Sequence, residues 1–270
     1  MKYLRSFHLS PETVRNPNVY PYNIFKDKTG ELFILDTITM FYGGNGSGKS
    51  TILNLLALKL GLKGGDMPKC FSIHIDYVEK YLSEIQLTFE ESEDGRKVQK
   101  PSEDSYYIKS EDILYEIKKI QQEAILQEGY LYQRQKLGMT REQAMEHKGS
   151  YEMRQQIERI SYSQEKYSNG ETSLQVYEDY LVPGGLYLLD EPEASLSPEK
   201  QLELIERIIE ASRFLDCQFL IATHSPLFLG RLEGKIYDLN QAGAVERKWS
   251  DLESIKTIAA FFKENLNLFK

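Results

Sequence analysis

The sequence predicts an α/β fold, in which a mostly parallel sheet is flanked by helices, with N-terminal antiparallel strands and an inserted helical lobe. The first third of the chain is rich in short runs with β-type patterns. From Ser110 to Lys166 the apolar residues fall instead at helical spacing, and β-branched runs disappear. After Tyr167, short apolar runs alternate with amphipathic helical stretches, which is typical of a parallel sheet with covered faces.

The composition is that of an ordinary globular protein of 270 residues. A net charge of −8 argues against broad attraction to nucleic acid or to an anionic membrane. No apolar run approaches the roughly 20 residues of a membrane span, and Met1–Ser10 lacks the apolar core of a signal peptide. Cys70 and Cys217 form neither a metal-ligand pattern nor a disulfide framework. We therefore expect a cytoplasmic protein.

The first third of the chain is expected to place several strands around one helix. Met1–Ser10 alternates apolar and polar residues, and Thr51–Leu60 has the pattern of a helix that ends at Gly61. The polar stretch Glu91–Asp104 predicts a hairpin connection. The other expected strands are Phe33–Leu35, Ile38–Tyr42, Phe71–Asp76, Ile85–Phe89 and Tyr106–Lys109.

The helical lobe, Ser110–Lys166, carries acids and bases in rough balance. A solvated helical face is therefore preferred over a DNA-binding surface. The α/β pattern then returns and continues to the C-terminus. The expected elements are a strand at Leu186–Leu189, a helix at Glu199–Ser212, a strand at Phe219–Ala222, a hairpin of Lys235–Leu239 and Val245–Lys248, and a helix at Ile255–Leu266.

A glycine-rich loop between the expected strand Ile38–Tyr42 and the following helix matches G-x-x-x-x-G-K-[ST], the P-loop pattern. Its glycines allow backbone N–H groups to wrap a phosphate, while the helix directs the positive end of its dipole at the same anion. The lysine suits the β- and γ-phosphates and the serine hydroxyl suits Mg²⁺. A glycine-rich turn with a stray lysine is the disfavoured alternative. The expected nucleotide-binding residues are Gly43, Gly44, Asn45, Gly46, Ser47, Gly48, Lys49, Ser50 and Thr51.

Two acids, Asp190 and Glu191, follow the apolar strand Leu186–Leu189. A carboxylate at the edge of such a sheet can hold Mg²⁺ close to the P-loop, so Asp190 and Ser50 are the expected metal residues. Glu191 is expected to orient or deprotonate the attacking water. Surface capping is the alternative for two such acids alone, and their pairing with a P-loop favours the catalytic interpretation.

Further motifs give the chain a resemblance to the ABC-type ATPases. Asp190 to Pro198, read D-E-P-E-A-S-L-S-P, resembles their Walker B motif and D-loop, and Ala222 to Pro226, read A-T-H-S-P, resembles their H-loop. Ser168, Gly170 and Glu171 stand where such proteins carry the signature motif. The resemblance implies ATP and Mg²⁺ as cofactors, and it implies that His224 contacts the γ-phosphate and the attacking water. Glu191, His224 and Lys49 are thus the expected catalytic residues.

The resemblance also implies a head-to-tail homodimer with ATP between the subunits. Ser168, Gly170 and Glu171 would reach nucleotide held by the partner, and Ser195 to Ser197 would line the interface. The signature departs from L-S-G-G-Q at three positions, Tyr167, Asn169 and Glu171. A plain helix N-terminus capped by Ser168 is the alternative interpretation of this segment.

Two other features of such ATPases lack a clear counterpart. The junction Lys109–Glu111, where a Q-loop glutamine would stand, contains Ser110 and Glu111 but no glutamine, and Gln86 is more simply a solvent-facing strand residue. Tyr20 and Tyr22 are candidates for stacking on adenine, with core or turn positions as the alternative. By the resemblance, residues 1–109 form the first part of the ATPase core, 110–180 the lobe with the signature, and 181–270 the rest of the core.

The resemblance is to small stand-alone bacterial proteins of the AAA family, which share a core with the SMC-like heads of chromosome-maintenance ATPases. It predicts ATP hydrolysis to ADP and phosphate, used as a conformational switch or motor. The alternative is a nucleotide-dependent module that regulates a partner effector, such as a nuclease, toxin or defence component. A transporter subunit fits less well because of the altered signature. A phosphotransferase is disfavoured, because such enzymes usually lack the D-E-P and T-H-S-P motifs. The alternative stays open because it needs a lid with phosphate-binding arginines, and the lobe contains Arg134, Arg141, Arg154 and Arg159.

Overall fold

The computed structural model of the protein describes residues 2–68, 75–91, 101–113, 170–194 and 196–269, with a few single residues or pairs between 115 and 140. Nearly all of the helical lobe lies outside the described residues, as do the first four residues of the expected strand Phe71–Asp76.

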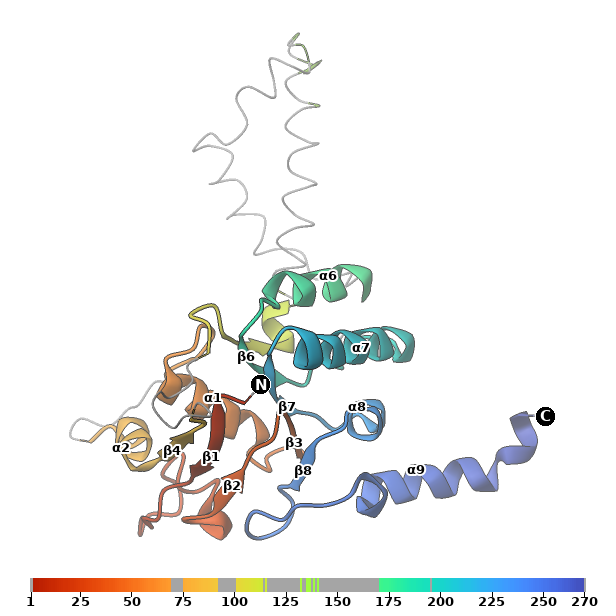
Figure 1. Ribbon diagram of the computed structural model, residues 1–270. Helices are drawn as coiled ribbons and strands as arrows, with labels where there is room; N and C mark the ends of the chain where they lie inside the picture. Colours follow the sequence, from red (N-terminus) through yellow and green to blue (C-terminus); the bar gives the residue numbers. More distant parts are fainter. Residues whose placement is uncertain are drawn as a thin grey trace.

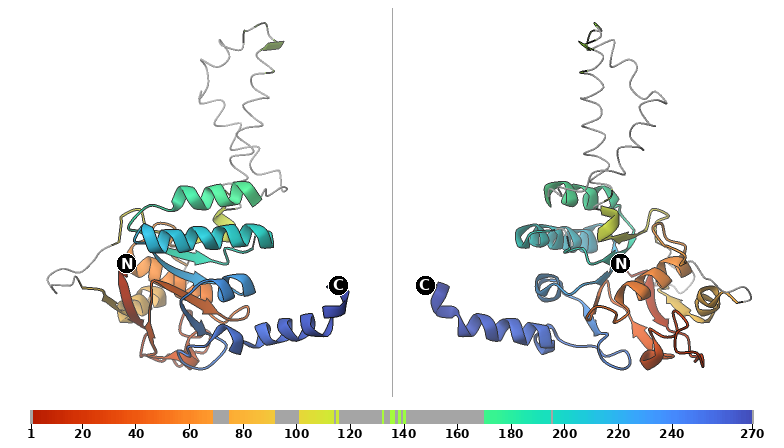
Figure 2. Two further views of the ribbon diagram at one scale, coloured as in Figure 1. Left: turned by 45° about the vertical axis from the view of Figure 1, so that its right-hand side comes forward. Right: turned by 180° about the vertical axis from the view of Figure 1, so that it is seen from behind.

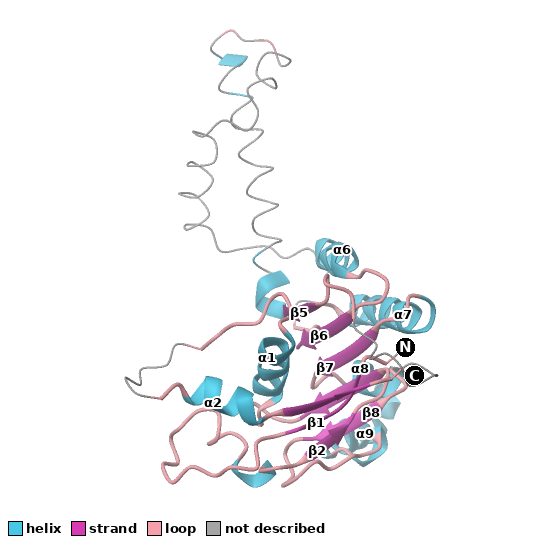
Figure 3. Ribbon diagram, turned by 60° about the vertical axis from the view of Figure 1, so that its left-hand side comes forward, coloured by secondary structure: helices cyan, strands magenta, loops and turns pink. Residues whose placement is uncertain are grey.

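The main sheet has five parallel strands in the order β5-β6-β7-β3-β8 (Figures 1 and 3). The α/β fold with a parallel sheet is therefore confirmed. Because every strand points the same way, the segments that leave the strands at their C-terminal ends meet at one edge, and this edge positions the site. The strands are β3 (Ile38–Tyr42), β5 (Tyr106–Lys109), β6 (Leu186–Asp190), β7 (Gln218–Ala222) and β8 (Lys235–Asp238).

A smaller antiparallel sheet holds the N-terminal strands, as expected, in the order β2-β1-β4. Its strands are β1 (Leu4–His8), β2 (Leu32–Ile34) and β4 (Gln86–Phe89). The hairpin predicted across Glu91–Asp104 is wrong, because β4 pairs with β1 whereas β5 pairs with β6 in the other sheet. The polar connection therefore joins two sheets. Local patterns could not reveal this, since strand pairing is decided by long-range contacts.

The helices flank the parallel sheet on both faces (Figures 2 and 3). Side chains alternate along each strand, so Tyr187 and Leu189 of β6 face one core while Leu186 and Leu188 face the other. The first core is covered by α6, α7 and α8, and the second by α1, α2 and the antiparallel strands. The helices are α1 (Lys49–Leu60), α2 (Tyr77–Glu84), α6 (Gly170–Tyr180), α7 (Pro198–Phe214), α8 (Pro226–Arg231) and α9 (Glu253–Glu264).

Helix ends follow from local residue chemistry. Gly61 takes a left-handed conformation and ends α1 where predicted. Asp76, expected in a strand, instead caps α2 by accepting hydrogen bonds from the backbone N–H groups of Val78 and Glu79. Ser197 caps α7 with Pro198 in its first turn.

The C-terminal region is only partly the predicted hairpin. β8 pairs in parallel with β3, and it meets the Val245–Lys248 segment through one bridge between Tyr237 and Glu246 and an ion pair between Lys235 and Glu246. Helix α9 then extends away from the body, and 3-10 turns occur at Lys26–Lys28, Trp249–Asp251 and Leu266–Phe269 (Figure 1). Within the described ranges, no helix combines the length and the apolarity needed to cross a membrane.

Candidate nucleotide site

The loop between β3 and α1 can be built only with glycine at its critical positions. A Cβ on Gly43 would lie 2.4 Å from Ser47 Oγ. Gly48 has φ +99°, and a Cβ there would lie 2.9 Å from both Ile24 Cγ2 and Phe25 Cε1. These positions have no room for a side chain, because the backbone runs close to its neighbours. Helix α1 has no side-chain cap at its start, so its first N–H groups are left for another partner. This is the geometry that binds phosphate.

The lysine of the loop is folded back over it. Lys49 is 5% exposed, and its Nζ donates to the carbonyl oxygens of Gly43 at 2.8 Å and Gly44 at 3.4 Å. Gly44 N–H in turn donates to Asn240 Oδ1 at 2.9 Å. Asn45 is exposed. The ammonium group is therefore held beside the loop's backbone, where a phosphate wrapped by the loop would meet it.

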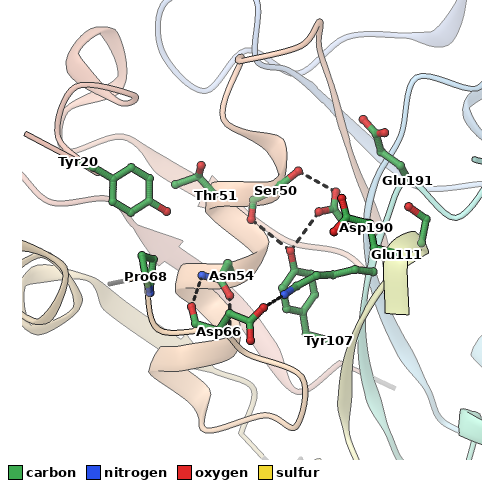
Figure 4. Close-up of a pocket in the computed structure, with 12 residues that line it drawn as sticks. Tyr20, Ser50, Thr51, Asn54, Asp66, Pro68, Tyr107, Glu111, Asp190 and Glu191 are labelled. Carbon is green, nitrogen blue, oxygen red and sulfur yellow. Dashed lines mark hydrogen bonds and ion pairs between the residues drawn. The ribbon is translucent and has the colours of Figure 1, made fainter. Parts of the chain in front are cut away.

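Asp190, at the end of β6, meets the start of α1 (Figure 4). Ser50 Oγ donates to Asp190 Oδ1 at 3.0 Å, and the Tyr107 hydroxyl donates to Asp190 Oδ2 at 3.1 Å. Burial raises the pKa of Asp190, although the hydrogen bonds from Ser50 and Tyr107 oppose this shift. Burial and the charge of Asp190 raise the pKa of Tyr107, which keeps its hydroxyl protonated as a donor.

The Ser50 and Asp190 oxygens fit the needs of Mg²⁺. They are hard oxygen donors 3.0 Å apart beside the phosphate loop. In the described part of the chain, no group of three or more His, Cys, Asp or Glu residues could hold a metal ion. Mg²⁺ commonly binds through one or two protein oxygens together with substrate phosphates, so this sparse donor set suits a nucleotide-bound magnesium.

Glu191 lies between the loop lysine and the histidine that follows β7. Its Oε1 lies 3.5 Å from Lys49 Nζ and 3.7 Å from His224 Nδ1. Its backbone has φ +48°, which is uncommon for a residue other than glycine and is found disproportionately at functional sites. The backbone N–H of Glu191 donates to the Ala222 carbonyl at 2.9 Å, and this bond ties the turn to β7. Asp190 and Glu191 thus face different partners.

A pocket of about 380 Å³ extends from these residues along α1 (Figure 4). Tyr20 and Thr51 line it together, and burial raises the pKa of Tyr20. Tyr22 does not line it, because its ring packs edge-on against Tyr81 and its hydroxyl donates to Glu84. Gln86 is exposed on the antiparallel sheet. The remaining lining residues are Ser50, Asn54, Asp66, Pro68, Tyr107, Lys109, Ser110, Glu111, Asp190 and Glu191.

The signature and D-loop residues are described only in part. Gly170 is the first residue of α6, whereas Ser168, the side chain of Glu171 and all of Ser195 lie outside the described residues. Their expected roles, and the division of the chain at residues 109 and 180, stay predictions.

Three of the residues that the structure brings to the site have no role predicted from the sequence. Tyr107 stands in an ordinary strand pattern, and only its place opposite Leu188 in the sheet brings it to Asp190. Lys109 forms an ion pair with Asp66. The fourth residue of the D-E-P-E run, Glu193, is buried against the turn after β7, and a charged residue so close to Walker B was a signal that could have been weighed.

Two of the similar solved structures are covered by this chain over nearly their whole length. One is the Smc head domain of Pyrococcus furiosus with an extended coiled coil, bound to the C-terminal domain of ScpA (14% identity, 97% of this chain and 100% of that chain covered, TM-score 0.47). Another is cbiO1 of Clostridium perfringens, part of the ABC transporter complex cbiONQ (15% identity, 100% and 98% covered, TM-score 0.45). These similarities concern the fold alone.

Sequence comparison is more specific. No curated protein sequence matches this chain significantly. A family profile described as "AAA domain, putative AbiEii toxin, Type IV TA system" matches residues 71–230. The matched segment begins after the P-loop and contains Asp190, Glu191 and His224. Because it extends over more than half of the chain, this protein belongs to that AAA domain family.

Proposed function

We propose that the protein hydrolyses ATP to ADP and phosphate. One observation carries the proposal: groups suited to each part of the reaction meet at the C-terminal edge of the parallel sheet. Lys49 and Ser50 come from α1, Asp190 and Glu191 from the end of β6, and His224 from the end of β7. Catalysis of phosphoryl transfer consists largely of such positioning and charge stabilisation.

Each side chain has a role in this mechanism. The backbone N–H groups of the loop and the start of α1 bind the phosphates, and Lys49 contacts the β- and γ-phosphate oxygens. Ser50 and Asp190 hold Mg²⁺, which supplies positive charge to the transferred phosphoryl group. Glu191 accepts a proton from the attacking water, and His224 donates a hydrogen bond to the γ-phosphate oxygens. Tyr20 lies where a ring could stack on adenine.

The hydrolysis site is completed, in this proposal, by a second copy of the chain. Ser168, Gly170 and Glu171, the residues of the candidate signature, would reach the γ-phosphate on the partner, so that ATP closes a head-to-tail homodimer and hydrolysis opens it. The family description names a putative toxin of a Type IV TA system. It favours the second candidate, a nucleotide-dependent module that regulates a partner effector with little turnover of its own.

Turnover and assembly of two variants test the proposal. Lys49→Ala should lower ATPase activity at least 100-fold, because it removes the positive charge that contacts the phosphate oxygens. Glu191→Gln should lower kcat by a similar factor while ATP stays bound, and it should accumulate ATP-dependent dimers in size-exclusion chromatography. The rate per wild-type subunit should rise with protein concentration.

The controls separate the two candidates. Glu210→Gln, at a side chain 58% exposed on α7, should leave the rate unchanged. Equal ATPase rates in the wild type and in Lys49→Ala would refute ATP hydrolysis at this site. A rate per subunit that is flat with concentration would refute the composite site. Stimulation of a slow basal rate by a co-purifying protein or by DNA would favour the regulatory module.

A further inference from the structure

Glu193, two residues beyond Glu191, is buried against the turn that follows β7. Its side chain is only 5% exposed. Its Oε1 accepts hydrogen bonds from Thr223 Oγ1 at 2.7 Å, from the His224 backbone N–H at 2.9 Å and from the Ser225 backbone N–H at 3.1 Å. A buried carboxylate is costly unless it is hydrogen-bonded in this way. One carboxylate oxygen therefore organises three consecutive residues of the turn.

The same oxygen faces the imidazole of His224. Glu193 Oε1 lies 3.4 Å from His224 Nδ1, closer than Glu191 Oε1 at 3.7 Å. The His224 side chain is 58% exposed, so packing alone does not fix the orientation of its ring. A partner at one ring nitrogen fixes the orientation and the tautomer of an imidazole, and it leaves the other nitrogen for the ligand. Glu193 is suited to be that partner because it is itself held rigidly.

The second oxygen of Glu193, Oε2, is buried like the first. Oε2 is buried and has no hydrogen-bond partner among the described residues, and the same holds for the hydroxyl of Tyr177 on α6, which is 1% exposed. Burial raises the pKa of Tyr177, and the charges of Glu193 and Asp190 raise it further, so the hydroxyl lies within electrostatic reach of this carboxylate. A protonated phenol can donate the hydrogen bond that Oε2 lacks.

We propose that Glu193 is a positioning residue of the hydrolysis site, which orients the imidazole of His224 and connects it through Tyr177 to helix α6. The inference rests on the proposed ATP hydrolysis. In this proposal the Tyr177 hydroxyl donates a hydrogen bond to Oε2 when α6 moves toward the turn after β7. A movement of α6, the helix that carries the candidate signature, then acts through the Glu193 carboxylate on His224, the residue proposed to contact the γ-phosphate.

A double-mutant cycle tests the orienting role. Glu193→Gln preserves shape but removes the charge, and it should lower kcat about tenfold or more with the KM for ATP changed less than twofold. In a His224→Ala background the same change should cost less than twofold, because the imidazole it orients is gone. Glu233→Gln, at a side chain 91% exposed, is the matched control and should not change kcat. An equal loss in both backgrounds would overturn the proposal.

A spectroscopic measurement reads the orientation without activity. The chain has four histidines, so the imidazole ¹⁵N signals of His224 can be assigned by comparison with His224→Ala. Glu193→Gln should shift the Nδ1 signal of His224 and alter its tautomer populations, while Glu233→Gln leaves them unchanged. Identical His224 signals in wild type and Glu193→Gln would refute the orienting contact.

The link to α6 has its own variant. Tyr177→Phe removes only the hydroxyl, and it should lower kcat severalfold with little further loss when combined with Glu193→Gln. Full additivity of the two changes would refute the link. Tyr177→Phe also keeps the proposal testable if the Glu193→Gln variant proves to be much less stable than wild type. A wild type without Lys49-dependent ATPase activity would refute the proposed function, whereas the histidine signals would still decide whether Glu193 orients His224.

Discussion

Tyr107 shows how one side chain can orient a predicted metal ligand. It is 2% exposed on β5, and its hydroxyl contacts Asp190 Oδ2 at 3.1 Å and lies 3.4 Å from the Ser50 carbonyl oxygen. Ser50 Oγ occupies the other oxygen of Asp190. The two hydrogen bonds leave the carboxylate no freedom to rotate, and they favour its charged form against the effect of burial. Tyr107 thus orients the predicted magnesium ligand from behind.

Replacing this phenol should weaken magnesium binding selectively. Tyr107→Phe keeps the buried ring but removes the hydroxyl from Asp190, so the Mg²⁺ concentration for half-maximal ATPase activity should rise about tenfold, as for other groups that support a metal ligand. Binding of Mg²⁺-free nucleotide should be unchanged. Tyr115→Phe, at a side chain 64% exposed, is the control. An unchanged magnesium requirement in Tyr107→Phe would contradict this role.

Among the elements, α2 is joined to the N-terminal segment by the hydrogen bonds of one acid as well as by the packing of Tyr81 against Tyr22 and Phe25. Glu84 accepts hydrogen bonds from Ser10 Oγ at 2.6 Å, from the Tyr22 hydroxyl at 2.7 Å and from Lys80 Nζ at 2.6 Å. Burial alone would raise the pKa of Glu84, but the hydrogen bonds from Lys80, Ser10 and Tyr22 outweigh it and the pKa is lowered. The charged form of Glu84 therefore holds α2 against the segment that leads to the P-loop.

This attachment should depend on pH in a defined direction. The folded-state pKa of Glu84 lies below the unfolded value of 4.5, so its stabilisation is present above pH 4.5 and is lost as the pH falls through the folded pKa. Glu84→Gln should lower the free energy of unfolding by about 2 kcal/mol at pH 7. In urea unfolding, this difference should shrink below pH 4. A difference that stays constant with pH would contradict the assignment.

For the whole molecule, Gln218 joins the two sheets. It is fully buried on β7, and its Oε1 accepts hydrogen bonds from the backbone N–H groups of Tyr3 at 2.8 Å and Leu4 at 2.9 Å. Its Nε2 donates to the carbonyl oxygens of Leu4 at 2.8 Å and Asp36 at 3.0 Å. All four hydrogen bonds of the amide are satisfied, so one side chain anchors β1 to the parallel sheet.

Removal of this amide should destabilise the entire protein. Gln218→Leu leaves three buried backbone groups and one partly buried group without their partner, and the free energy of unfolding should fall by at least about 3 kcal/mol. Gln175→Leu, at an exposed position on α6, should change it by less than about 0.5 kcal/mol. Chemical denaturation of both variants gives the comparison. A loss below 1 kcal/mol in Gln218→Leu would show that the sheets are held together by apolar packing alone.

Local patterns were sufficient wherever the determining contacts are local. The P-loop, the strand before Asp190 and the helix that ends at Gly61 each depend on neighbouring residues, and all lie where predicted. The predicted strand end at Asp76 is wrong, because the Asp76 side chain caps α2. The predicted hairpin failed because β4 and β5 find their partners far along the chain.

The sequence by itself determined the fold class and the motif residues, because glycine spacing, charge and apolar periodicity are properties of short segments. Only the tertiary structure decided which groups surround those residues. It placed Tyr107 on Asp190 and Glu193 on the turn that carries His224, contacts that join residues 83 and 31 positions apart. Such contacts arise when parallel strands bring their C-terminal ends to one edge of the sheet, and no local pattern encodes that arrangement.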